Sequence, residues 1–125
     1  MILVDSSGWL EWFANGPLAG AYQKYFKDLD DVVTPTIVLY EVYKRVKSQY
    51  GEEKALVVTA QMGKTAVVPL TDAVALTAAD VSLAHRIAMA DSIVYATALS
   101  QNAQLVTSDS DLGHLPGVVY LPKRK

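Results

Sequence analysis

Short apolar runs alternate with segments of helical periodicity along most of this 125-residue chain. The run Ile2–Val4 ends at a polar turn, after which Trp9, Trp12 and Phe13 recur at helical spacing. Strands that alternate with helices are joined by right-handed crossovers and pair in parallel. We therefore predict an α/β fold, a three-layer α/β/α sandwich around a central, mostly parallel sheet. Residues 1–125 are expected to form a single domain, because no linker, repeat or low-complexity segment interrupts the pattern.

The same patterns predict the remaining elements. Thr34-Pro35-Thr36 is typical of a helix start, and Thr71-Asp72 of a helix N-cap. Further strands are predicted at residues 32–33, 66–70, 104–106 and 118–121. Further helices are predicted at residues 18–29, 36–50, 52–62, 72–83 and 90–102.

Composition restricts the chemistry. Apolar residues make up 51% of the chain and charged residues 19%. With this composition, the burial of apolar side chains can outweigh the loss of chain entropy, so we expect a folded protein. There is no cysteine, and His85 and His114 are the only histidines. A metal site would therefore be built mainly from oxygen ligands, which favours Mg²⁺ or Mn²⁺ over Zn²⁺. The net charge of −2 argues against a general polyanion binder, so nucleic-acid contacts must be local.

The location of the protein is also an expectation from sequence. The apolar start Met1–Val4 is interrupted by Asp5 and carries no basic leader, so we do not expect a signal peptide. No uncharged apolar run approaches the roughly 20 residues that a membrane span needs. We expect a cytoplasmic protein without a membrane partner.

Four acidic residues are the candidates for a metal site. Asp5 follows the first strand and Asp109 follows the strand that ends at Val106, so both belong at the carboxyl edge of the sheet. Glu41 and Asp91 lie in predicted helices. Four acids around one edge would repel one another unless cations lay between them. The pattern predicts two Mg²⁺ or Mn²⁺ ions about 4 Å apart, suited to phosphodiester hydrolysis by an activated water.

Each acid taken alone also has a purely structural interpretation. Asp5 suits an N-cap, Asp91 suits the first turn of a helix, and residues 107–111 suit a polar turn. Glu41 lies among apolar residues, where a buried acid needs a partner, but it also stands four residues before Arg45 and so suits an exposed ion pair. For the single residues both interpretations stay open.

Four segments together resemble the acidic motifs of PIN domains, and most of all the VapC toxins of VapBC toxin-antitoxin modules. The segments are Asp5-Ser6-Ser7, Glu41 after Thr34-Pro35, Ala90-Asp91-Ser92-Ile93 and Thr107-Ser108-Asp109-Ser110-Asp111-Leu112. Their order, spacing and the chain length match across nearly the whole sequence. Leu112 departs from the pattern, because an aromatic residue is more usual there.

The resemblance implies a Mg²⁺- or Mn²⁺-dependent endoribonuclease that acts as a toxin. It also implies a homodimer, neutralised by a co-expressed antitoxin whose tail covers the active site. By motif, the metal ligands are Asp5, Glu41, Asp91 and Asp109. Ser6 and Thr107 match polar neighbours that hydrogen-bond the acids or water, and Asp111 matches a supporting acid.

Asp109 and Asp111 are expected to differ in role. If the extended strand geometry continues past Val106, side chains two residues apart in this turn do not both serve the ions. We expect Asp109 to face the metal and Asp111 to support a ligand or cap the following turn.

Two other classes of function fit the same residues. One is a metal-dependent phosphohydrolase or a DNA-directed nuclease, and the other is a non-catalytic partner-binding module. Further candidates each have a structural alternative. An aromatic and basic ridge for RNA (Tyr40, Tyr43, Lys44, Lys47 and Tyr50), a phosphate contact (Arg86) and a basic tail (Lys123, Arg124 and Lys125) also suit a solvated surface. Trp9, Trp12 and Phe13 suit the core or a dimer interface better than a base-stacking platform, and His114 suits a structural role.

Overall fold

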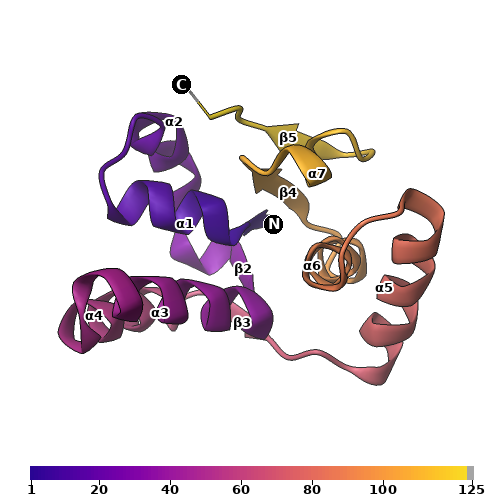
Figure 1. The fold of residues 1–125 in the computed structure, drawn as a ribbon, viewed down its shortest axis with the longest axis horizontal. Coiled ribbons are helices and arrows are strands. Elements are labelled where there is room, and N and C mark those ends of the chain that lie inside the picture. Colours follow the sequence, from indigo (N-terminus) through magenta and orange to yellow (C-terminus); the bar gives the residue numbers. More distant parts are fainter. Residues whose placement is uncertain (124–125) are drawn as a thin grey trace.

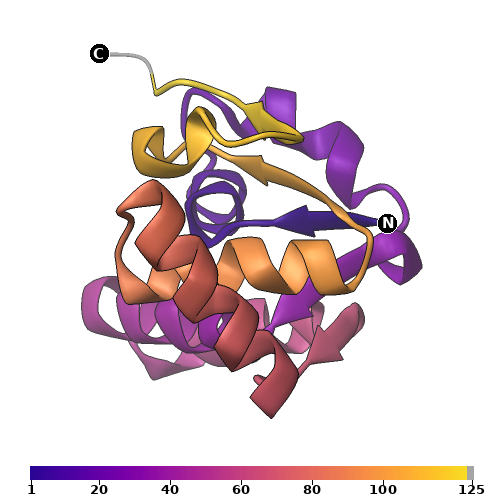
Figure 2. The same ribbon diagram turned by 90° about the vertical axis from the view of Figure 1, so that its right-hand side faces the viewer.

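The computed structural model describes residues 1–123 and contains one five-stranded sheet in which every strand pair is parallel. The strand order is β3-β2-β1-β4-β5. Figure 2 shows β1 and β4 side by side and running in the same direction. The strands are β1 (Ile2–Val4), β2 (Val32–Pro35), β3 (Ala66–Val68), β4 (Gln104–Thr107) and β5 (Val118–Tyr120). The predicted parallel sheet is confirmed.

Helices cover both faces of the sheet. Helices α1 to α4 lie on one side, and α5 and α6 on the other, with α7 beside β5 (Figure 1). The helices are α1 (Ser6–Phe13), α2 (Ala19–Gln23), α3 (Thr36–Tyr50), α4 (Glu52–Met62), α5 (Asp72–His85), α6 (Met89–Ser100) and α7 (Ser110–Gly113), with 3₁₀ turns η1 (Lys24–Phe26) and η2 (Leu29–Asp31). The predicted α/β/α sandwich is therefore confirmed.

The order of the strands explains the two helical layers. The chain moves from β1 to β2 and β3 in one direction, and then crosses back over β1 to β4 and β5. Right-handed crossovers in opposite directions place their helices on opposite faces. The direction reverses between β1 and β4, and such a switch point leaves a crevice at the carboxyl ends of the two strands. This crevice is where Asp5 and Asp109 lie.

Several local predictions from sequence differ from the structure. The helix expected over residues 18–29 tightens to the 3₁₀ turn η1 after Gln23. The helical path then ends at Asp28, which is extended and whose side chain accepts a hydrogen bond from the Asp30 backbone N–H over 3.1 Å at the start of η2. Strand β3 ends at Val68, since Pro69 has no N–H to donate. The polar turn after β4 contains the short helix α7, which the sequence pattern did not indicate.

Close packing joins α1 to the strand before it. Trp9 and Tyr22 are completely buried in the main core beside Val4. A Cβ atom added to Gly8 would lie 2.6 Å from a Val4 side-chain carbon and would overlap the ring of Tyr22. Glycine at this position therefore lets α1 approach the end of β1, which fixes Asp5 between them.

Within residues 1–123, no single helix is long and apolar enough to cross a membrane, although α5 and α6, bent by 117° at their junction, pass that test as a pair.

Candidate metal centre

Asp5 joins the end of β1 to the start of α1. It is the N-cap of α1, and its Oδ1 accepts a hydrogen bond from the Ser6 backbone N–H over 2.8 Å. Its Oδ2 accepts a hydrogen bond from the Thr107 hydroxyl over 2.8 Å. Only 4% of Asp5 is exposed, and this burial raises the pKa of its carboxyl group, although the bond from Thr107 partly offsets the rise. Asp5 is thus a cap and also a buried acid at the sheet edge.

A network of hydroxyl groups holds the two strand ends together. The Thr107 hydroxyl accepts a hydrogen bond from the Asp109 backbone N–H over 2.9 Å, and the Ser7 hydroxyl accepts one from the Ser108 N–H over 3.0 Å. The Ser108 hydroxyl lies 2.6 Å from the hydroxyl of buried Tyr22. Sequence reasoning missed Ser7, Ser108 and Tyr22 as site residues. Ser7 stands directly after Ser6 in the motif, but nothing in the sequence pairs Tyr22 with a residue 86 positions away.

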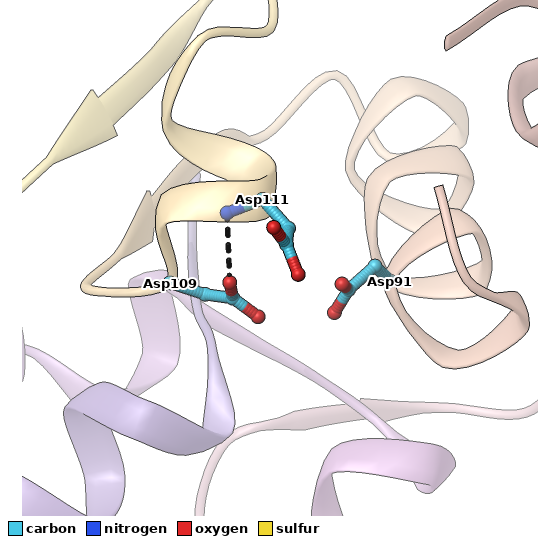
Figure 3. Close-up of side chains that lie close together, drawn as sticks. All are labelled: Asp91, Asp109 and Asp111. Atoms are coloured by element: carbon cyan, nitrogen blue, oxygen red, sulfur yellow. Dashed lines mark hydrogen bonds between the residues drawn. The ribbon is translucent and has the colours of Figure 1, made fainter. Parts of the chain in front are cut away.

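Three carboxyl groups, one from α6 and two from the turn that contains α7, lie close together. One oxygen from each of Asp91, Asp109 and Asp111 lies within 4.8 Å of the others. Figure 3 shows Asp91 reaching from α6 toward the other two. Burial, followed by the negative charges of Asp109 and Asp5, raises the pKa of Asp91 to about 7. The cluster therefore carries repulsion that a cation would relieve.

The placement of Asp111 corrects the expected alternation of side chains. The extended geometry does not continue to residue 111, because Asp109 caps α7 and Asp111 lies in its first turn. The Asp111 backbone N–H donates to Asp109 Oδ1 over 2.8 Å, and this turn brings both carboxyl groups to the same side (Figure 3). Asp111 thus lies in the cluster rather than away from it.

Glu41 approaches the crevice from α3. Its side chain is half-buried, and burial together with the charge of Asp5 raises its pKa, while the Ser6 side chain partly offsets the rise. Within the described chain, Glu41 and Arg45 do not form the ion pair that their spacing allows. Of the two interpretations of Glu41, the structure supports the one in which it faces the other acids.

The four predicted metal ligands line one cleft of about 610 Å³. Asp5, Glu41, Asp91 and Asp109 all contribute to its wall, as do Ser6, Ser7, Leu10, Glu11, Ala14, Arg45, Ser108, Ser110 and Lys123. Among the described residues of this wall, Arg45 and Lys123 are the basic ones. The cleft wall therefore carries more acids than bases, with one cation from α3 and another from the segment after β5.

The other predicted candidates lie elsewhere or serve the core. Trp9 is fully buried and Trp12 and Phe13 pack against the core. Arg86 is the exposed C-cap of α5, in a left-handed conformation with φ 55°. His114 is exposed. Of the basic tail, Arg124 and Lys125 lie outside the described residues.

Comparison with known families identifies the fold. The family model of the PIN domain matches residues 2–118. This chain belongs to the PIN domain family. No match was found among curated protein sequences. In this PIN domain, Leu112 of the last acidic segment is completely buried in the main core.

Solved structures share this PIN fold at low sequence identity. A toxin-antitoxin complex from Klebsiella pneumoniae matches with a TM-score of 0.80 and 18% identity, over 95% of this chain and 96% of that one. VapC20 of Mycobacterium tuberculosis, described as a sarcin-ricin loop cleaving toxin, matches with a TM-score of 0.79 and 20% identity, over 94% and 97%. FitAcB from Neisseria gonorrhoeae matches with a TM-score of 0.73 and 22% identity, over 98% of both chains.

The donor set of this PIN domain fits a hard divalent cation. Its side-chain ligands would all be carboxylate oxygens, which suit Mg²⁺ and Mn²⁺. Burial is the first cause of the raised pKa values of Asp5, Glu41 and Asp91, and the negative charge of Asp109 adds to the rise in all three. A cation in the cleft would reverse the electrostatic part of these shifts, so the residues present favour its binding.

Proposed function

We propose that this protein is a metal-dependent endoribonuclease and the toxin of a type II toxin-antitoxin module. The observation that carries the proposal is the acidic cleft: carboxyl groups from the end of β1, from α3, from α6 and from the turn after β4 converge in a PIN fold. Asp5, Glu41, Asp91 and Asp109 would hold Mg²⁺ or Mn²⁺, with Asp111 beside them.

The chain's own residues would orient the reaction. A bound divalent cation would supply charge neutralisation at the phosphodiester and lower the pKa of the attacking water. Thr107 and the Ser6 backbone N–H fix both oxygens of Asp5, so this carboxylate cannot rotate freely. The Asp111 N–H fixes one oxygen of Asp109 in the same way. These bonds would hold the ligands in place before substrate arrives.

RNA as the substrate is supported by the chain's resemblance to VapC toxins and by one structural neighbour, VapC20, which is a toxin that cleaves the sarcin-ricin loop. The alternatives are DNA and small phosphoesters, which the same acids would serve. Purified protein with Mn²⁺ should cut single-stranded or loop RNA and leave single-stranded DNA and a nitrophenyl phosphodiester intact. Faster turnover of DNA or of the small ester would contradict the ribonuclease assignment.

An antitoxin is the partner that we propose for the cleft. The acids of its wall outnumber the basic residues Arg45 and Lys123, so an Arg or Lys side chain from another chain would be attracted there. Several structural neighbours were solved as toxin-antitoxin complexes. The protein encoded beside this one should copurify with it and inhibit cleavage. If that neighbour neither binds nor inhibits, the toxin assignment fails while the nuclease assignment stands on its own test.

We further propose that two copies associate through α5 and α6, in the cytoplasm that the sequence predicts. Large apolar side chains are exposed on this side of the fold, among them Leu83, which is 82% exposed, and Met89, which is 74% exposed. Light scattering after size exclusion should report a dimer. Leu83→Lys should shift it to a monomer, whereas Leu56→Lys on α4 should not. A wild-type monomer at micromolar concentration would contradict the dimer.

A further inference from the structure

The outer surface of α3 contains a second hollow next to the acidic cleft. This α3 recess has a volume of about 390 Å³ and is lined by Tyr40, Glu41, Lys44, Arg45 and Ser48. Glu41 and Arg45 line the acidic cleft as well. The two hollows therefore adjoin along one helix, and a chain bound in the cleft has a direct route into the recess.

Tyr40 offers an aromatic surface in this recess. Its side chain is 61% exposed, and the Lys44 ammonium lies 5.6 Å from the ring centroid. The two residues are four positions apart on α3, so the pair is a local contact within one helix face. A lysine over one ring face restrains the ring, and an exposed, restrained aromatic ring is a platform on which a nucleic-acid base stacks.

Basic side chains next to Tyr40 would contact phosphates. Lys44 and Arg45 are both exposed, and in the described part of the chain neither takes part in a salt bridge. The net charge of −2 argues against binding by bulk attraction, so a polyanion is held by cations placed locally. Lys123, in the segment after β5, lines the acidic cleft and adds a further cation there.

We propose that the α3 recess binds the nucleotide next to the scissile phosphate of single-stranded RNA. The base stacks on Tyr40, and Lys44 and Arg45 contact the backbone phosphates. This inference rests on the proposed ribonuclease function and adds to it a site for the substrate strand. The recess is mixed aromatic and basic and continuous with the acids, which favours a nucleic-acid strand over an acidic segment of a protein partner.

The test measures the affinity of a short, labelled adenosine-rich single-stranded RNA by fluorescence anisotropy. All proteins carry Asp91→Asn, so that the RNA stays intact. Tyr40→Ala should weaken binding about 5- to 10-fold, the lower part of the range for loss of one base stack. Tyr40→Phe should bind normally, because the ring is kept.

Tyr50 and Lys54 provide the matched controls. Tyr50 is 47% exposed, and Lys54 lies 5.7 Å from its ring centroid, but neither residue lines the recess. Tyr50→Ala should leave the affinity unchanged. Lys44→Ala should reduce the slope of log affinity against log salt by about 0.7, the value for one phosphate contact on a single strand, and Lys54→Ala should not.

The two levels of the proposal fail separately. If the wild-type protein cuts RNA but Tyr40→Ala and Tyr50→Ala bind alike, the recess assignment is wrong and the ribonuclease assignment stands. If the wild-type protein cuts no RNA but Tyr40→Ala alone loses affinity, the recess is supported and the ribonuclease is not. If Tyr40→Ala keeps its RNA affinity and instead weakens inhibition by the protein encoded nearby, the recess is a protein contact and the inference is overturned.

Discussion

The Thr107 hydroxyl donates a hydrogen bond to Asp5 Oδ2 over 2.8 Å and thereby joins two strand ends that are 102 residues apart in the sequence. The Thr107 hydroxyl oxygen in turn accepts a hydrogen bond from the Asp109 backbone N–H over 2.9 Å. One buried hydroxyl therefore sets the positions of two of the proposed metal ligands. It also satisfies a carboxylate oxygen that burial would otherwise leave without a partner.

Thr107→Val should damage both the site and the fold. The variant keeps the shape of the side chain but leaves the Asp5 oxygen and the Asp109 N–H unpaired, at a cost of about 1 to 3 kcal/mol in the free energy of unfolding. RNA cleavage at saturating Mn²⁺ should fall about 10- to 100-fold, as is usual when a residue that orients a ligand is lost. Thr107→Ser should restore most of both properties. Cleavage by Thr107→Val at the wild-type rate would contradict this role.

Asp109 should matter more than Asp111, although both lie in the cluster. The negative charge of Asp109 raises the pKa values of Asp5, Glu41 and Asp91. The charge of Asp111 raises the pKa of Asp91 alone among these three acids. Asparagine at 109 still accepts the Asp111 N–H, so Asp109→Asn removes the charge and keeps the α7 cap. Single-turnover assays should give a larger loss for Asp109→Asn, with Asp111→Asn also weakening Mn²⁺ binding. Normal Mn²⁺ affinity of Asp111→Asn would show that its position in the cluster is incidental.

The metal-free protein should lose stability as pH rises from about 4 to about 7. Asp91 has a pKa of about 7 in the folded protein and 3.8 in the unfolded chain. Below pH 3.8 the group is protonated in both states and does not affect the free energy of unfolding. Between pH 3.8 and pH 7 the unfolded chain ionises more readily than the folded protein, so the folded state becomes progressively less stable. Because the group is partly exposed and screened by water, we expect a contribution of about 1 to 2 kcal/mol.

Urea unfolding in EDTA at several pH values measures this effect. Asp91→Asn should flatten the profile and equal or exceed the wild-type stability at pH 7, while gaining less stability from added Mn²⁺. Asp80→Asn, an exposed change on α5, should behave as the wild type. If the free energy of unfolding of the wild type does not change with pH, or rises toward pH 7 in parallel with that of Asp91→Asn, the result would count against repulsion between the carboxylates of the cleft.

Much of the fold was predictable because its signals are local. The α4 boundaries Glu52–Met62 match the prediction, since residues of helical periodicity stand between Gly51 and Gly63. The start of α3 at Thr36 also follows from the Thr34-Pro35 signature. The change to 3₁₀ geometry after Gln23 has no signal in the sequence pattern, because the apolar stripe continues through residues 25–29. The helical path ends only at Asp28, whose side chain caps η2.

The site was predictable in its acids and not in their supports. Parallel strands require that Asp5 and Asp109 share an edge, whatever the details of packing. The direction of Asp111 depended on α7, whose four residues give too short a pattern to recognise. The bond between Tyr22 and Ser108 depends on how α2 packs after the chain has folded, so no local pattern indicates it.

The most direct test of the account is the rate of cleavage of a single-stranded RNA as a function of Mn²⁺ concentration, for wild type, Asp91→Asn and Asp80→Asn. The account predicts saturable cleavage by wild type and Asp80→Asn, its complete loss in EDTA, and no detectable cleavage by Asp91→Asn although that variant is folded. Cleavage by wild type in EDTA, or by Asp91→Asn at the wild-type rate, would contradict a metal-dependent nuclease site in this cleft.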